Sequence, residues 1–308
     1  MNFTEMIMGT NDMQCAIIKI EEKKTSTNKA YSNITLADGL STIEAKMWTD
    51  PRMLSFGPKD VVNCVIEKQE YNGKDSFILR SASVDLAGDY RLFLPHAPIN
   101  PEVYFDDMMK IVMSIHDDDI RNITSSLLMS NRDKFVNHPA AKGMHHAFFN
   151  GLLYHTGRML ISADALSKVY DVDRDILIAA TALHDIGKLD ELQQDDAGAV
   201  TYSRDGEFLG HAVIAIEYIN ELCVSRGIDR HAEKIRMLEH CIAAHHGQLD
   251  WGAITVPHTK EAQLLHFIDN IDAKMEMFEE NIDNVTPGEI GEKVFSLGCG
   301  IYRAAQKY

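Results

Sequence analysis

The chain has 308 residues, 45% of them hydrophobic, which is enough for two domains that each bury a core. No apolar run approaches 18 residues and the N-terminus lacks a signal-like segment, so we expect no membrane span and a cytoplasmic protein. The net charge of −16 argues against tight, salt-driven binding to long nucleic-acid duplexes.

The acidic charge is unevenly distributed along the chain. Residues 1–86 hold 10 Lys and Arg against 12 Asp and Glu, whereas the remaining residues hold 20 against 34. A local basic face is therefore compatible with the first part. The five cysteines are widely spaced and form no Cys-x-x-Cys motif, which predicts reduced, mostly buried thiols and excludes a zinc ribbon.

Residues 1–86 have the pattern of a small all-β barrel. After a lead-in over 1–12, strand-like segments follow at 16–20, 30–36, 42–48, 61–66 and 76–79. Five short strands in a stretch of this size are typical of an OB-fold, with an SH3-like barrel as the alternative. OB barrels bind single strands by aromatic stacking, and Tyr31, Trp48 and Tyr71 are the candidates here. For Trp48, and for Phe77, the alternative is a place in the barrel core.

Glycine and proline then mark a linker over residues 87–101. From residue 102 to 308 the apolar spacing is helical, which predicts an all-α domain. Within it we expect a long helix over 141–170, a helix that starts at His211, and further helices over 230–247 and 259–283. A flexible loop or small hairpin over 195–210 and a loop over 248–258 are expected to border the site. The tail from residue 293 either folds back or packs across a partner chain.

The strongest chemical signal is the pair His184-Asp185, at the end of an apolar helix and followed by Gly187 as a helix stop and by Lys188. Neutral imidazole and carboxylate bind divalent first-row metals, and an adjacent lysine can hold a phosphate. A lone His-Asp pair carries little weight. However, most of the 14 histidines lie after residue 137, and several follow apolar helical segments.

Two neighbouring pairs refine this prediction. His245 and His246 point about 100° apart on a helix, so one is expected to bind metal and the other to contact either the substrate or the residues around the ligands. Asp269 and Asp272 share a helix face, with Asp269 as the metal candidate. Asp272 is expected to accept a hydrogen bond from the N–H of a ligand histidine.

The order His155, His184-Asp185 and Asp269 resembles the HD superfamily of metal-dependent phosphohydrolases. This resemblance implies a helical domain in which these four residues bind metal. His211 and His245 resemble the branch that holds two metals bridged by the aspartate of the pair. Residues 145–156, 244–247 and 261–274 further resemble bacterial YhaM-type 3'-5' exoribonucleases, over nearly the whole chain. Asn150 departs from the glycine expected there, which should affect packing more than metal binding.

We therefore predict a metal-dependent 3'-5' exonuclease, a phosphodiesterase that degrades single-stranded RNA and also single-stranded DNA. Its polarity follows from the resemblance alone. The predicted metal ligands are His155, His184, Asp185, His211, His245 and Asp269. Asp185 and Lys188 are the predicted catalytic residues, and His146, His246, Tyr31, Trp48 and Tyr71 the predicted substrate contacts.

Histidine and carboxylate donors suit Mn²⁺ first, and also Co²⁺, Fe²⁺ or Zn²⁺. A homo-oligomer is expected. One alternative is an HD phosphodiesterase or phosphatase that acts on small cyclic nucleotides, although the appended barrel favours a polymer. Another is a binding protein with a degenerate site, which the six filled ligand positions disfavour. No phosphate-binding Gly-Lys-Ser/Thr loop or dinucleotide-binding glycine motif occurs, so ATP or NAD dependence is not expected.

Overall fold

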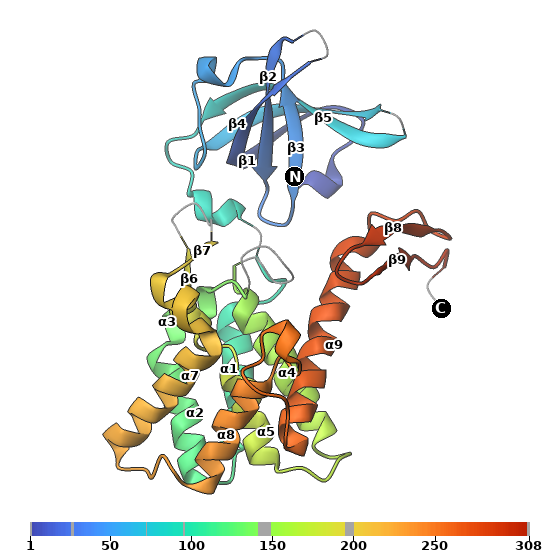
Figure 1. The fold of residues 1–308 in the computed structure, drawn as a ribbon. Coiled ribbons are helices and arrows are strands. Elements are labelled where there is room, and N and C mark those ends of the chain that lie inside the picture. Colours follow the sequence, from blue (N-terminus) through green and yellow to red (C-terminus); the bar gives the residue numbers. More distant parts are fainter. Residues whose placement is uncertain are drawn as a thin grey trace. The chain divides into compact units, whose positions relative to one another are not determined.

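The computed structural model describes residues 2–306 except 26–27, 72, 95, 141–148 and 195–199. The chain divides into two compact units, one covering Met1–His96 and the other Ala97–Gln193 with Val200–Tyr308 (Figure 1). Each unit has its own hydrophobic core. All five cysteines are free, and four of them are buried, as the sequence predicts.

The first unit is a closed barrel of five strands in the order β1-β2-β3-β5-β4. The strands are β1 (Gly9–Lys24), β2 (Ala30–Ala37), β3 (Thr42–Met47), β4 (Val61–Tyr71) and β5 (Lys74–Val84). Neighbouring strands are antiparallel except β3 and β5, which are parallel. Short 3-10 helices lie at Phe3–Glu5, Pro51–Met53 and Tyr90–Phe93. The five predicted strands are confirmed, but β1 begins inside the segment predicted to be a lead-in.

The barrel core follows from the two-residue period of its strands. In β1, for example, Asn11, Met13 and Cys15 are buried while the residues between them are exposed. Phe77 is partly buried against this core. Trp48 is 51% exposed, so the alternative prediction that it lies in the barrel core is wrong.

The second unit contains nine helices within the described residues. They are α1 (Pro101–Met113), α2 (Asp118–Ser130), α3 (Arg132–Asn137), α4 (Gly151–Leu166), α5 (Arg174–Leu183), α6 (Lys188–Glu191), α7 (Arg204–Arg226), α8 (Glu233–Ala244) and α9 (Lys260–Ile282). A short 3-10 helix, η4 (Leu249–Trp251), lies between α8 and α9. Every residue of α5 from Ile176 to Leu183 is buried, because α5 packs against α2, α4, α8 and α9.

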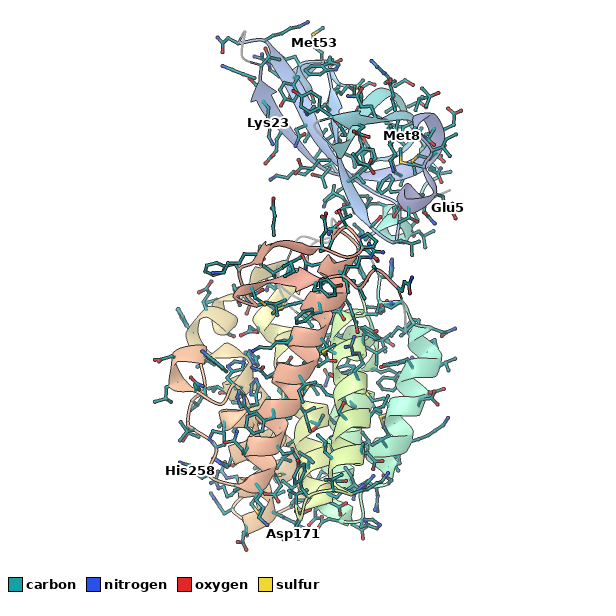
Figure 2. All side chains as sticks on the ribbon, turned by 90° about the vertical axis from the view of Figure 1, so that its right-hand side faces the viewer. Glu5, Met8, Lys23, Met53, Asp171 and His258 are labelled. Carbon is teal, nitrogen blue, oxygen red and sulfur yellow. The ribbon has the colours of Figure 1, made fainter. Side chains whose placement is uncertain are left out.

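Helix α9 lies beside α4 and α8 along one side of this unit (Figure 2). The segments before α5 and before α9 reach the same end of the bundle, where Figure 2 labels Asp171 and His258. Lys260 joins the two segments there, since its Nζ lies 2.9 Å from the Asp171 carboxylate. Helices α4, α5 and α9 therefore run as neighbours over the region that carries the ligand-type residues.

The prediction of an all-α second domain is wrong in two places. Strands β6 (Leu192–Gln194) and β7 (Val200–Tyr202) form one two-stranded sheet, and β8 (Ile290–Val294) and β9 (Cys299–Tyr302) form another. Strands of three to five residues are too short to show a clear two-residue period in the sequence. The tail from residue 293 thus forms part of a hairpin that follows α9. The helix predicted over 141–170 begins at Gly151 in the described part of the chain, and residues 141–148 lie outside it.

Helix α7 consists of two helical segments, of which the first, from Arg204, was not predicted and the second begins at His211 as predicted. Its backbone is non-helical at Gly210 (φ 74°, ψ 156°), so His211 starts a second helical segment after a kink. Among the described helices, α7 alone is long and apolar enough to cross a membrane by length and composition. Core helices of soluble proteins meet the same criterion, and α7 packs against α2, α6 and α8.

Candidate metal centre

The centre is built on the C-terminal end of α5. Asp173 caps the start of this helix by accepting hydrogen bonds from the backbone N–H groups of Asp175 and Ile176. The helix then places His184 and Asp185 in the interior, where Asp185 is 3% exposed. Gly187 was predicted as a helix stop, but its φ of −65° is ordinary for any residue. It is required for another reason, since a Cβ there would lie 2.0 Å from the backbone oxygen of His211.

The Asp185 carboxylate lies between two pairs of imidazoles. Its Oδ2 is 3.3 Å from His184 Nε2 and 3.8 Å from His155 Nε2. Its Oδ1 is 3.4 Å from His211 Nε2 and 4.0 Å from His245 Nε2. One carboxylate oxygen therefore faces each pair, which is the arrangement that a bridging ligand needs.

Asp269 completes the set from α9. Its Oδ1 lies 3.5 Å from His155 Nε2, on the side of Oδ2 of Asp185. The structure thus brings together all six residues that the sequence predicted as metal ligands. They come from α4, from the turn after α5, from α7, from the end of α8 and from α9, so no local pattern could place them.

Two of the four imidazoles are oriented by the backbone. His184 Nδ1 lies 2.9 Å from the carbonyl oxygen of Thr181, and His245 Nδ1 lies 2.6 Å from that of Ile242. A carbonyl oxygen only accepts, so Nδ1 carries the proton in both rings. Their Nε2 atoms therefore present lone pairs to the centre.

The other two imidazoles are oriented by carboxylates. His155 Nδ1 donates to Asp272 at 2.7 Å, as predicted for that residue, and His211 Nδ1 donates to Glu191 at 3.0 Å. Both Nε2 atoms consequently face the centre without a proton. Carboxylates in this position fix the ring and raise the basicity of a metal-binding histidine.

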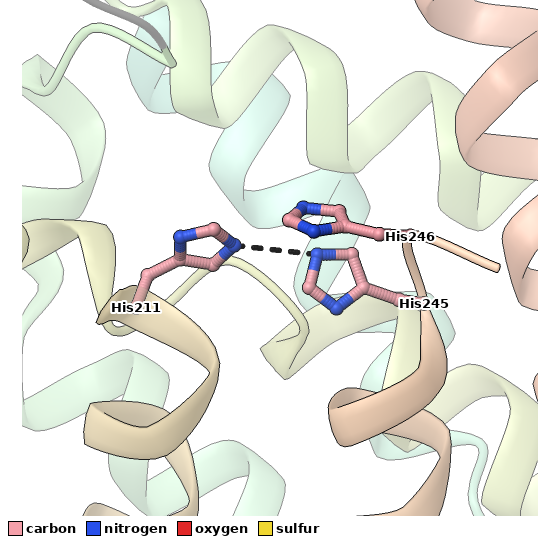
Figure 3. Close-up of side chains that lie close together, drawn as sticks. All are labelled: His211, His245 and His246. Atoms are coloured by element: carbon pink, nitrogen blue, oxygen red, sulfur yellow. Dashed lines mark hydrogen bonds between the residues drawn. The ribbon is translucent and has the colours of Figure 1, made fainter. Parts of the chain in front are cut away.

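The unsatisfied atoms of the centre test whether a cation fits. His184 Nε2 is buried and makes no hydrogen bond to the described residues. His211 Nε2 and His245 Nε2 are 3.3 Å apart, joined by the dashed line in Figure 3. With Nδ1 protonated in both neutral rings, two lone pairs meet here, and a cation bound to both Nε2 atoms would make this approach favourable. The donor atoms form two groups, each within 4.8 Å, namely His155, His184 and Asp185, and His211, His245 and His246. These residues fit two divalent metal ions.

Electrostatics keep most of the donors in the state that binds metal. Burial lowers the pKa of His155 and holds the pKa of His245 well below its usual value, which favours neutral rings. The pKa of His184 is raised instead: burial acts to lower it, but the Asp185 carboxylate outweighs burial, so a bound cation would have to displace a proton there. Burial alone would raise the pKa of Asp185, but Lys188 and His184 hold it well below the usual range. Burial likewise opposes the charge of Lys188, yet Asp185 raises the Lys188 pKa. Their contact is close, with Lys188 Nζ 2.5 Å from Asp185 Oδ2.

The cluster opens into a cavity of about 490 Å³. Lys188, His246 and Asp269 line it together with Tyr202, Trp251 and Asn270. Of the other predicted substrate contacts, His146 lies outside the described residues. Tyr31, Trp48 and Tyr71 belong to the barrel, where the rings of Tyr31 and Trp48 lie 5.2 Å apart and Lys46 Nζ is 6.0 Å from the Tyr71 ring.

The sequence was compared with known proteins. Residues 152–274, which include all six ligand positions, match the HD domain family. The chain is 34% identical over 297 residues to the 3'-5' exoribonuclease YhaM of Bacillus subtilis (strain 168), covering 94% of this chain and 93% of that protein. It is 34% identical to the protein of that name from Geobacillus sp. (strain WCH70), covering 93% and 89%. It is 33% identical to the one from Listeria welshimeri serovar 6b, covering 91% of each.

The chain belongs to the YhaM family. The match extends over both compact units, because the helical unit alone could not account for 94% of the chain. Asn150, the residue that departs from the glycine expected in this family, has a φ of 62°. Glycine is favoured in this left-handed region, and asparagine tolerates it. Its side-chain amide donates to the carbonyl oxygen of Val136 at 2.6 Å, which anchors the start of α4.

Glu191 is a residue of this YhaM-family site that the sequence analysis missed. Its carboxylate accepts from both Nδ1 and the backbone N–H of His211, each at 3.0 Å. Burial acts to raise the pKa of Glu191, but these hydrogen bonds lower it. The two residues are 20 positions apart, so only the fold reveals the contact. Arg158 plays a similar part for Asp272, since its Nε lies 2.6 Å from Asp272 Oδ1.

Replacing Glu191 with alanine should weaken metal binding on the His211 side by about 10- to 100-fold, because the ring loses its fixed tautomer. Glu191→Gln keeps an acceptor oxygen and should lose less. Titration of each metal-free variant with Mn²⁺ in the presence of a competing chelator measures the two affinities. Glu207→Ala, which removes an exposed carboxylate from α7, the helix that carries His211, is the matched control. Unchanged affinity in Glu191→Ala would show that the hydrogen bond has no role in orientation.

Proposed function

We propose that the chain is a metal-dependent 3'-5' exoribonuclease that acts on single-stranded RNA, with single-stranded DNA as a second substrate. The observation that carries this proposal is the convergence of four imidazole Nε2 atoms on the two oxygens of Asp185. Membership in the YhaM family, whose curated members are named 3'-5' exoribonucleases, supplies the polymer substrate and the polarity.

His155, His184, Asp185 and Asp269 would hold one metal ion, and Asp185, His211 and His245 the second, with His246 within reach of it. Mn²⁺ is proposed first, and Co²⁺, Fe²⁺ or Zn²⁺ would suit the same donors. Bound ions of this kind activate a water for attack on phosphorus and neutralise charge on the phosphate.

Lys188 has a separate role in this proposal. It reaches the cavity from the N-terminus of α6, and its contact with Asp185 keeps it charged. It would neutralise a non-bridging phosphate oxygen as negative charge increases in the transition state. The surrounding residues orient it and limit the access of water, since Asp185 and its four imidazole neighbours are almost completely buried.

The barrel over residues 1–86 is proposed to be an OB-fold that guides the strand, joined by residues 87–101 to the HD domain over 102–308. Its strand order and the single parallel pairing of β3 with β5 support the OB assignment. Tyr31, Trp48 and Tyr71 are the proposed stacking residues, and Tyr71 is 64% exposed. A cytoplasmic homo-oligomer completes the proposal.

The test uses metal-free protein, Mn²⁺ and single-stranded RNA labelled at its 5' end, with cyclic dinucleotides in parallel. The proposal predicts labelled products that shorten stepwise from the 3' end, and no reaction with a chelator present. Turnover of the cyclic dinucleotides alone would favour the small-nucleotide phosphodiesterase. Internal cleavage would contradict an exonuclease.

Deleting residues 1–86 should raise the KM for long single strands by about 10-fold or more, because base stacking contributes about 1–3 kcal/mol per base. Hydrolysis of dinucleotides should persist, since every proposed ligand lies in the unit with the other core. Trp48→Ala and Tyr71→Ala in the full chain are the controls for damage caused by truncation. A folded truncated protein that degrades long strands as well as the full chain does would exclude the barrel as the strand guide.

A further inference from the structure

Two partly exposed aromatic side chains are among the residues that line the cavity beside the ligand cluster. Tyr202 ends β7, and Trp251 ends η4, so they come from two different connections of the helical unit. Both line the cavity of about 490 Å³ and are 45% and 52% exposed. Neither side chain is one of the proposed metal ligands, and neither has a role in the proposed hydrolysis.

Trp251 is held in place by its own loop. Its backbone N–H donates to Gln248 O at 3.0 Å, and the N–H of Ile254 donates to Ala243 O at 3.0 Å. Gly247, which precedes the loop, has a φ of 79°, and a Cβ there would lie 2.4 Å from the His266 ring. The Trp251 ring lies 5.8 Å from the same His266 ring. The indole therefore keeps half of its surface in solvent on a loop with a fixed backbone.

The walls beside these rings differ from the base of the cavity. Ala140 and Ala273 are apolar lining residues, whereas Asp185, Lys188 and Asp269 are charged and the lining histidines are polar. A ligand that fits both parts has a flat apolar group joined to a phosphate. The terminal nucleotide of a single strand has this composition, and aromatic rings bind every base through its face.

We propose that Trp251 and Tyr202 form a stacking subsite for the 3'-terminal nucleobase of the strand. The inference rests on the proposed function, because the phosphate beside this base is the one presented to Lys188 and the ligand cluster. Stacking requires an unpaired base, so the subsite selects single-stranded 3' ends. It reads no base edge, so all four bases are accepted.

Fluorescence tests the subsite without turnover. The chain has two tryptophans, Trp48 and Trp251, so Trp48→Tyr leaves Trp251 as the only one and keeps an aromatic ring on the barrel. A dinucleotide added in the presence of a chelator should quench Trp251 emission, and ribose 5-phosphate, which lacks a base, should not. Equal quenching by the two compounds, or none by the dinucleotide, would overturn the proposal.

Kinetics supply the second readout. Trp251→Ala should raise the KM for a single-stranded oligonucleotide by about 10-fold, while Trp251→Phe and Tyr202→Phe, which keep a ring, should lose little. For the same strand with an abasic 3'-terminal nucleotide, Trp251→Ala and the parent should be equal. An equal loss on both strands would show that Trp251 only supports the fold. If neither the parent nor any variant hydrolysed the strand, the proposed function would be rejected instead. Base-dependent quenching of Trp251 would still report the stacking subsite in that case.

Discussion

Replacing Asp185 with alanine should reduce hydrolysis of single-stranded RNA by at least 100-fold. Each oxygen of this carboxylate faces a different pair of imidazoles, so its loss removes a donor from both proposed metal positions. Lys188 also loses its partner, and its proposed orientation with it. The measurement is the initial rate with saturating Mn²⁺.

Asp185→Asn is the matched variant for this prediction. It preserves the size of the side chain but removes the negative charge, so it should be inactive while its thermal unfolding stays close to that of the parent. Both variants remove the carboxylate beside Lys188, but the amide oxygen of asparagine can still accept a hydrogen bond from Lys188 Nζ, so the alanine variant is expected to be the less stable of the two. Activity above about a hundredth of the parent in a folded asparagine variant would exceed what the loss of a bridging ligand permits.

Lys188→Met should lower kcat by about 100- to 1,000-fold with little change in KM, because the proposed contact strengthens as charge develops on the phosphate. Methionine retains the approximate length of the side chain without its charge. Lys188→Arg keeps the charge and should recover part of the rate. Single-turnover kinetics on a short RNA strand separate the chemical step from binding.

The Asp185 contact gives this second prediction a control of its own. The charge of Lys188 is the strongest of the interactions that lower the pKa of Asp185. Lys188→Met should therefore raise that pKa and weaken metal binding at low pH. The rate must therefore be compared with both metal positions filled. A parental kcat in the metal-loaded methionine variant would exclude Lys188 from the transition state.

The sequence predicts the barrel well because its strand segments are short, rich in β-branched residues and separated by turn residues, and a two-residue period of burial is present in β1 from Asn11 to Cys15. The His184-Asp185 pair is recognisable because the helix before it is apolar on every side. The ligand set as a whole came from the resemblance to a family. Distances between the donors depend on how five segments pack, and no spacing along the chain determines them.

Other features could not be predicted because they depend on contacts between distant residues. In the sequence, nothing distinguishes Glu191 from other acidic residues, because its role depends on its contact with His211 of α7. Gly187 was interpreted as a helix stop, whereas its role is to let the His211 backbone approach. The sequence also could not choose between His245 and His246, because the choice depends on the ring orientation, and the contact of His245 Nδ1 with the Ile242 carbonyl oxygen, which turns Nε2 toward Asp185, supports His245.

The number of metal ions per chain tests the central claim most directly, because it depends only on the two donor groups around Asp185. Metal-free protein is loaded with Mn²⁺, separated from free ions, and analysed by mass spectrometry alongside His155→Ala and His211→Ala. We predict two ions in the parent and one in each variant, with the ion beside His155 lost in His155→Ala and the ion beside His211 lost in His211→Ala. A single ion in the parent protein would contradict the dinuclear centre.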